Sequence, residues 1–118
     1  MDLYLIELTV ADLALSLPWY RDRFGLSVER LDEANGYALL AAGPCKLALK
    51  QGQPSPGSAK FVFRVDHLEA TLQRLAIHNI APSGPLKTSE EGYRSAKFVD
   101  PDGYRLEMFE WVEVRDLD

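Results

Sequence analysis

The feature that most limits the fold of this chain is an internal duplication. Residues 4–50 read as a strand, a helix and three further strands, and residues 59–110 repeat that order. In each copy, a run of period two, typical of a half-buried strand, precedes a helical stripe of apolar residues. Residues 51–58, rich in Pro, Gly and Ser, join the copies. The duplication predicts an α+β fold: two βαβββ modules, about 1–50 and 59–112, in a single domain 1–118.

The two helices are predicted to end in the same way and to begin differently. Gly25 and Asn79 follow the last helical turns, and both residue types tolerate the left-handed conformation that ends many helices. At the start, Asp66 is predicted to cap the second helix, whereas Ala11 holds the matching position of the first. Pro18 falls inside the first helix and is expected to kink it.

Three strand-like runs are expected after each helix. They lie around residues 27–31, 37–41 and 46–50 in the first copy, and around 82–86, 94–99 and 104–110 in the second. Alternation places apolar side chains of the last strands under the helices and mixed side chains on the opposite face of the sheet. A face of mixed character suits a concave ligand site. The candidate ligand-binding residues are Glu7, Tyr37, Lys60, Arg64, Arg105, Glu107 and Phe109.

Composition narrows the classes of partner. The net charge is −5 and no basic stripe is present, so nucleic acid is not expected as a partner. No apolar run approaches the length of a membrane span, and the N-terminus lacks the features of a signal peptide. Cys45 is the only cysteine, which excludes an internal disulfide and a Cys-based zinc site. A cytoplasmic location and no membrane association are expected.

Three segments together resemble one family. Residues 7–13 (ELTVADL) with residues 16–25 (SLPWYRDRFG) are similar to the opening module of the vicinal-oxygen-chelate superfamily of glyoxalase I, bleomycin-resistance proteins and extradiol dioxygenases. Residues 63–68 (FRVDHL) resemble the start of its second module, and residues 92–107 resemble its closing hairpin. The resemblance implies two βαβββ modules whose sheets curl into a cup, with helices outside, often completed in a homodimer.

The resemblance also implies where a metal would be held. Enzymes of this superfamily bind a divalent metal through one residue from the first and last strand of each module. Those positions correspond here to Leu5, Ala48, Lys60 and Glu107, and of these four only Glu107 offers a suitable ligand atom. We therefore expect no metal and no cofactor. Instead, the Lys60 ammonium should replace the charge of the metal and pair with Glu107.

The leading hypothesis is a metal-free protein that binds a small organic molecule, in its sharpest form an antibiotic or toxic metabolite that is sequestered. The alternatives are a lyase, isomerase or dioxygenase-type enzyme with a non-standard site, and a structural or regulatory dimer without a ligand. No residue is assigned a catalytic role, because His67 and His78 read as solvated positions of the second helix. A homodimer is expected from the aromatic side chains Trp19, Tyr37 and Trp111.

Overall fold

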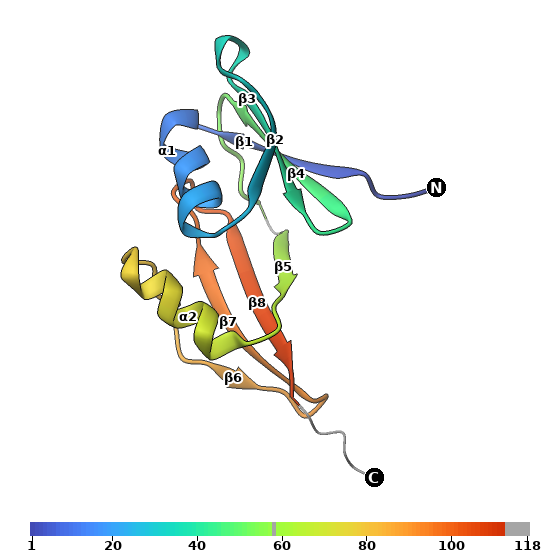
Figure 1. The fold of residues 1–118 in the computed structure, drawn as a ribbon, viewed down its shortest axis with the longest axis vertical. Coiled ribbons are helices and arrows are strands. Elements are labelled where there is room, and N and C mark those ends of the chain that lie inside the picture. Colours follow the sequence, from blue (N-terminus) through green and yellow to red (C-terminus); the bar gives the residue numbers. More distant parts are fainter. Residues whose placement is uncertain (58, 113–118) are drawn as a thin grey trace. The chain divides into compact units, whose positions relative to one another are not determined.

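The computed structural model describes residues 1–57 and 59–112, and it forms two compact units (Figure 1). Unit 1 spans Met1–Pro56, and unit 2 begins at Gly57. Each unit holds one four-stranded sheet and one α-helix. In the described ranges, no helix combines the length and the apolar character that crossing a membrane requires.

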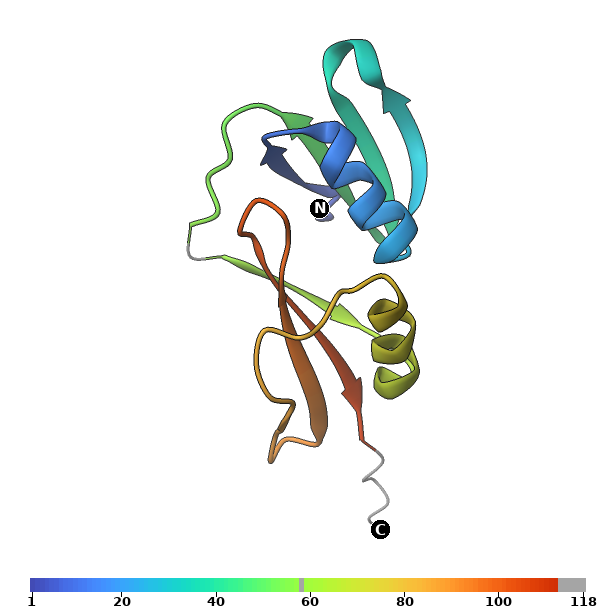
Figure 2. The same cartoon turned by 90° about the vertical axis from the view of Figure 1, so that its left-hand side faces the viewer.

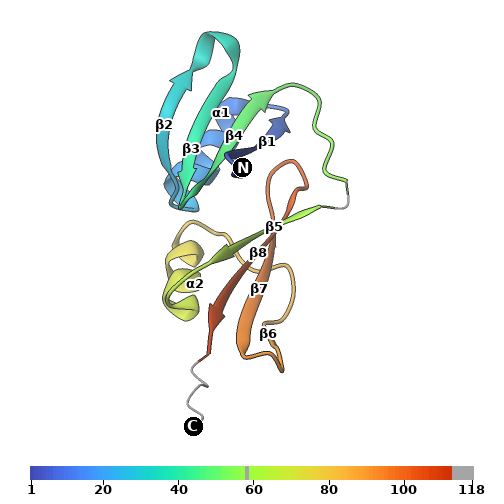
Figure 3. The ribbon, with the colours of Figure 1, turned by 90° about the vertical axis from the view of Figure 1, so that its right-hand side faces the viewer.

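The two units share one topology, which confirms the predicted duplication. Unit 1 contains β1 (Leu5–Val10), α1 (Leu13–Pro18), a π-helical turn (Trp19–Arg23), β2 (Ser27–Asp32), a 3₁₀ turn (Glu33–Asn35), β3 (Tyr37–Ala42) and β4 (Cys45–Gln51). Unit 2 contains β5 (Lys60–Arg64), α2 (Leu68–Ile77), β6 (Lys87–Thr88), β7 (Tyr93–Val99) and β8 (Arg105–Trp111). The strand orders are β1-β4-β3-β2 and β5-β8-β7-β6 (Figure 3). The first and last strands of each unit run parallel, and the other pairs are antiparallel.

One predicted strand is displaced. The run expected at residues 82–86 forms no strand, and β6 consists of the two residues that follow it directly, Lys87 and Thr88. Pro82 and Pro85 lie within the expected run, and proline has no backbone N–H to donate to a sheet. The segment still touches the sheet, because the Ser83 amide donates to the carbonyl of Lys97 over 2.8 Å.

Each helix packs on one face of its own sheet, as Figure 2 shows. The alternate residues of β4 and β8 predicted to face the helices are buried: Leu47, Leu49, Leu106 and Met108. The strand pairing aligns Leu8 with Leu49 and Phe63 with Met108, so Leu5 and Ala48 are the structural equivalents of Lys60 and Glu107. The opposite face of each sheet is therefore the one that carries the candidate site residues.

The helix C-termini match the prediction. Gly25 has φ of 94° and Asn79 has φ of 62°, both in the left-handed region. Gly25 lies twelve positions after Leu13, whereas Asn79 lies eleven after Leu68, so the first helical segment holds one more residue.

The extra residue is accommodated by the π-helical turn that begins directly after Pro18. Proline cannot donate the α-helical hydrogen bond to the carbonyl four residues earlier, and wider turns of this kind typically appear as single insertions. The turn buries both Trp19 and Tyr20, and the Trp19 ring stacks on Phe24 with centroids 5.1 Å apart. Trp19 is therefore not one of the exposed aromatic residues expected from the sequence.

The helix N-termini differ from the prediction. Asp12, not Ala11, caps α1 and accepts a hydrogen bond from the Ala14 amide over 3.0 Å. In α2, the residue before the helix is His67, with no side-chain cap of its own, and Asp66 pairs with Arg64 instead. A carboxylate already engaged by a neighbouring guanidinium is drawn away from the helix end.

Both helices receive a second type of cap from their own sheets. The Leu13 amide donates to Gln51 Oε1 over 2.9 Å, and the Leu68 amide donates to Glu110 Oε1 over 2.9 Å. Gln51 and Glu110 occupy equivalent positions near the ends of β4 and β8, two residues after the aligned Leu49 and Met108. The duplication thus extends to a polar contact that ties each helix to its last strand.

Candidate functional site

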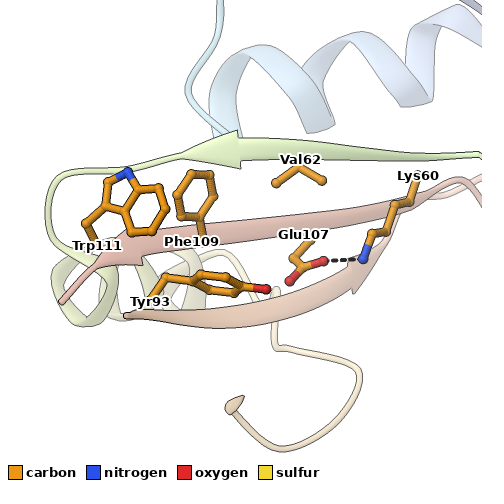
Figure 4. A pocket seen from close by; sticks show the side chains of 6 residues that line it. All are labelled: Lys60, Val62, Tyr93, Glu107, Phe109 and Trp111. Atoms are coloured by element: carbon orange, nitrogen blue, oxygen red, sulfur yellow. Dashed lines mark hydrogen bonds and ion pairs between the residues drawn. The ribbon is translucent and has the colours of Figure 1, made fainter. Parts of the chain in front are cut away.

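A cavity of about 250 Å³ lies on the helix-free face of the unit 2 sheet. Its lining residues come from three strands: Lys60 and Val62 from β5, Glu107, Phe109 and Trp111 from β8, and Tyr93 from β7 (Figure 4). We call this cavity the aromatic pocket. It has an apolar end made by the three rings and a charged end made by Lys60 and Glu107, as Figure 4 shows.

An ion pair forms the charged end of the aromatic pocket, as predicted. The Lys60 ammonium contacts Glu107 Oε1 at 2.5 Å. Strand pairing places Val62, not Lys60, directly opposite Glu107, so the long lysine side chain reaches diagonally to the carboxylate. The two side chains differ in exposure, 46% for Lys60 and 10% for Glu107. Glu107 is therefore the fixed member of the pair, and Lys60 is its solvent-facing partner.

The environment of Glu107 favours the ionised carboxylate. The hydrogen bond from Lys60 is the main cause that holds the pKa of Glu107 below its usual value. Burial opposes this effect, and a further hydrogen bond from the buried Ser95 hydroxyl supports it. A carboxylate with a lowered pKa is a weak general base near neutral pH, where an efficient base would have a pKa close to 7.

The apolar end consists of Tyr93, Phe109 and Trp111, which we call the aromatic wall. The three ring pairs meet edge to face, with centroids 5.7, 5.9 and 5.3 Å apart and interplanar angles of 68°, 84° and 88°. Edge-to-face contacts fix each ring against the next. Trp111 remains 58% exposed, so the wall offers a rigid aromatic surface without collapsing onto itself.

The candidate residues from the sequence divide between this pocket and other places. Lys60, Glu107 and Phe109 line the pocket. Arg105 is exposed on the same face but is not a lining residue, and the Arg64 guanidinium contacts Asp66 at 3.0 Å beside α2. Glu7 is exposed on β1 and Tyr37 is half-buried at the start of β3, so both belong to unit 1.

Tyr93 is the lining residue that sequence reasoning missed most clearly. The expected strand began at Arg94, and β7 begins one residue earlier. Tyr93 pairs directly with Trp111 across β7 and β8. Extending the alternation of Ser95 and Lys97 back by one step would have put Tyr93 on the pocket face. Arg94, the neighbour on the other face, points to the helix side, where its guanidinium lies 3.5 Å from Glu69.

The residues at the superfamily's metal positions do not fit a metal. In unit 1, Leu5 and Ala48 have no ligand atom in their side chains. In unit 2, the Lys60 ammonium holds Glu107, and its positive charge opposes a cation. Across residues 1–57 and 59–112, no three His, Cys, Asp or Glu side chains gather as a metal site would need.

Solved structures with the same fold come from several bacteria. An antibiotic-binding protein, TnmS3 from Streptomyces sp. CB03234, aligns with a TM-score of 0.79 at 24% identity, covering 94% of this chain and 96% of that one. A lactoylglutathione lyase from Agrobacterium tumefaciens aligns with a TM-score of 0.76 at 21% identity, covering 92% of each chain. A glyoxalase/bleomycin resistance protein/dioxygenase from Nocardioides reaches a TM-score of 0.77 at 20% identity, covering 97% and 85%.

At these identities the structural likeness shows a shared fold and nothing more specific. No curated protein matches the sequence. The family model described as Glyoxalase/Bleomycin resistance protein/Dioxygenase superfamily matches residues 3–108, which is most of the chain. Together with the repeated βαβββ topology, this match shows that the chain belongs to the glyoxalase/bleomycin resistance protein/dioxygenase superfamily.

Proposed function

We propose that this protein binds a small organic molecule in the aromatic pocket without a metal ion. The observation that carries the proposal is the contact of the Lys60 ammonium with Glu107 Oε1. These two residues stand where metal-dependent relatives would place two ligands, and they satisfy each other's charge. The adjacent aromatic wall gives an apolar surface, and a few polar groups beside such a surface are typical of small-molecule sites.

Binding is favoured over catalysis by the chemistry of the same residues. Glu107 is the one acidic lining residue, and its lowered pKa makes it a poor proton acceptor at neutral pH. The similar structures include both an antibiotic-binding protein and a lyase, so the shared fold does not choose between the two functions. The most specific version of the proposed function is sequestration of an antibiotic or a toxic metabolite.

Thermal unfolding tests the proposal, because a molecule that binds the native state raises the melting temperature. A panel of aromatic antibiotics should contain members that raise it, whereas zinc, nickel, manganese and iron should not. Trp111→Ala should abolish the rise. Tyr4→Ala, which removes an exposed aromatic ring from unit 1, is the matched control and should keep it. Stoichiometric metal binding that is lost in Glu107→Gln would contradict the metal-free proposal.

A further inference from the structure

The face of the unit 2 sheet that carries the aromatic pocket, which we call the ligand face, is strongly biased in charge. Strand alternation and pairing place one acidic residue on it, Glu107, among the described strands β5 to β8. The basic residues on the same face are Lys60, Arg64, Lys87, Lys97 and Arg105. The ligand face therefore has an excess of positive charge beside its single carboxylate.

Part of this positive charge is already neutralised by neighbouring acids. Lys60 contacts Glu107, and Arg64 contacts Asp66. Lys97 is exposed and stands directly opposite Glu107 in the pairing of β7 with β8. Within residues 59–112, Lys97 forms no ion pair at contact distance, and its charge acts on Glu107 only as a weaker Coulombic influence. A surplus cation thus lies next to the charged end of the pocket.

Lys60 also keeps hydrogen-bonding capacity for a ligand. An ammonium group has three donors, and Glu107 Oε1 takes one of them. The Lys60 side chain is 46% exposed, so its remaining donors can reach an acceptor that enters from solvent. An incoming oxygen anion would find Lys60 and Lys97 on either side of a carboxylate that is already neutralised.

The equivalent face of unit 1 lacks this bias. There the position that matches Lys97 is Leu39, which pairs with Ala48. Lys46 contacts Glu29 at 2.8 Å, and Lys50 donates to the carbonyl of Asn35. The sheets have the same topology, so the positive bias is a property of the side chains of unit 2 and not of the fold.

The net charge of the whole chain does not cancel the local effect. At physiological ionic strength, charges separated by more than about 8 Å are largely screened. The total of −5 therefore has little influence on an anion that has entered the pocket. For a group bound in the pocket, the nearest cations are Lys60, which lines it, and Lys97, which stands beside Glu107.

We propose that the aromatic pocket takes a flat aromatic ligand with one carboxylate group. The ring would lie against the aromatic wall, and the carboxylate would accept hydrogen bonds from Lys60 with Lys97 nearby. This inference rests on the proposed binding function of the same pocket, and it adds the chemical class of the ligand.

Three probes of nearly identical shape isolate the charge: 2-naphthoate, 2-naphthamide and 2-naphthamidine, which are anionic, neutral and cationic at pH 7. Binding is followed by NMR through the indole N–H signals of the two tryptophans, with Trp111 in the pocket and Trp19 buried in unit 1 as the internal reference. The naphthoate should bind about five- to tenfold more tightly than the amide, because hydrogen bonds to charged groups are stronger than neutral ones. The amidine should bind most weakly.

Two matched variants locate the preference. Lys97→Gln should weaken naphthoate binding about threefold, the size expected for an exposed charge, and leave naphthamide binding unchanged. Arg74→Gln removes the same charge from α2, on the other side of the sheet, and should change neither. The double variant Lys60→Met with Glu107→Gln removes the pair without leaving a buried carboxylate unpaired. It should reduce the preference for naphthoate over naphthamide to about the threefold that Lys97 contributes.

The outcomes distinguish failure of the proposed ligand class from failure of the pocket as a binding site. Tight naphthoate binding that depends on Lys97 supports the inference. Equal or tighter binding of the amide or the amidine, with a shift of the Trp111 signal, overturns the inference and leaves small-molecule binding in place. If none of the three probes shifts the Trp111 signal, both the aromatic pocket as a binding site and the ligand class are overturned.

Discussion

Lys60 and Glu107 depend on each other unequally, because one is half exposed and the other is nearly buried. Removing the ammonium would leave a carboxylate with little access to water, whereas removing the carboxylate would leave an ammonium that water can hydrate. The cost of breaking a pair comes mainly from the member left unsatisfied in the interior. Loss of Lys60 should therefore destabilise the protein more than the solvent exposure of the lysine alone suggests.

We predict that Lys60→Met lowers the free energy of unfolding by about 1–3 kcal/mol, the usual cost of an unsatisfied buried polar group. The partial exposure of the site favours the lower end of that range. Urea denaturation measures the change. Lys97→Met, an equally large change on the exposed surface, should stay within about 0.5 kcal/mol of the parent protein. Equal effects in the two variants would show that Glu107 does not need Lys60.

Protonation of Glu107 should contribute to the loss of stability at acid pH. Its pKa is lowered in the folded protein, so the unfolded chain takes up the proton first as the pH falls. The contribution to stability is then complete above the unfolded value, about 4.3, and is lost as the pH drops through the lower folded value. Denaturation followed from pH 7 to acid should show a shallower acid loss for Glu107→Gln than for the parent chain. Parallel curves would contradict the prediction.

Among single residues, the sequence predicted the ion pair at the charged end of the pocket and missed one residue of the aromatic wall. The Lys60–Glu107 pair followed from alternation and from the superfamily's register, both of which act through the backbone. Tyr93 was missed because its strand begins one residue earlier than expected. Arg64 stands on the predicted face, but the short distance to Asp66 on the same connection draws its guanidinium away from the pocket.

Each α-helix is anchored at its N-terminus by a contact that is distant in the sequence. The caps from Gln51 and Glu110 bridge 38 and 42 positions of the chain, so no local capping pattern contains them. For α2, this explains why the local pattern around Asp66 led to the wrong capping residue. The cap of α1 by Asp12 is local, and it lies one residue after the position of Ala11. In contrast, the positive φ values at Gly25 and Asn79 were predictable, because that conformation is a property of the residues themselves.

We predict that Glu110→Ala and Gln51→Ala each destabilise the protein by about 1 kcal/mol, the usual value of a helix cap. Glu110→Gln keeps an acceptor for the Leu68 amide and should cost less. Amide hydrogen exchange reports the local effect: the first turn of α2 should exchange faster in Glu110→Ala, and that of α1 in Gln51→Ala. Unchanged exchange at Leu13 and Leu68 would show that solvent replaces these caps without loss.

The π-helical turn and β6 are the two elements whose form the sequence predicted incompletely. Pro18 predicted a disturbance in the first helix, and the structure resolves it as a π-helical turn that holds one extra residue. The sequence did not specify this form, because a helix can accommodate the missing N–H of proline either by a kink or by an inserted residue. For β6, the repeated order of elements suggested a strand at residues 82–86, but Pro82 and Pro85 have no backbone N–H to donate to a sheet.

For the whole molecule, topology was more predictable than chemistry. The repeated order of elements predicted two βαβββ units. The structure confirms them, because the strand order and the pairing of the first with the last strand are the same in both. The side chains on the faces opposite the helices have diverged: Ala48 of unit 1 stands where unit 2 has Glu107, and Lys50 stands where unit 2 has Phe109. Among residues 1–57 and 59–112, the combination of the aromatic wall with the Lys60–Glu107 ion pair therefore belongs to unit 2.

The last prediction concerns association of whole chains. Exposed large apolar side chains that do not line the aromatic pocket occur in both units, for example Leu3, Tyr4, Leu31, Ile77 and Val99. Trp19 does not contribute, because it is buried against Phe24, and Trp111 lines the aromatic pocket, so the expectation rests on the other exposed apolar residues. A twofold dimer is the most common symmetric assembly, and its interface buries the same patch of residues on both chains.

We therefore predict a homodimer, with a mass about twice the 13.3 kDa of one chain, in sedimentation equilibrium at micromolar concentration. Because association depends on concentration, dilution should shift the average mass toward that of one chain. If apolar contacts drive the dimer, moderate salt should leave the association intact, since hydrophobic burial is not screened as charges are. A single species of 13.3 kDa across the micromolar range would contradict the prediction, and the exposed apolar residues would then be those of a stable monomer.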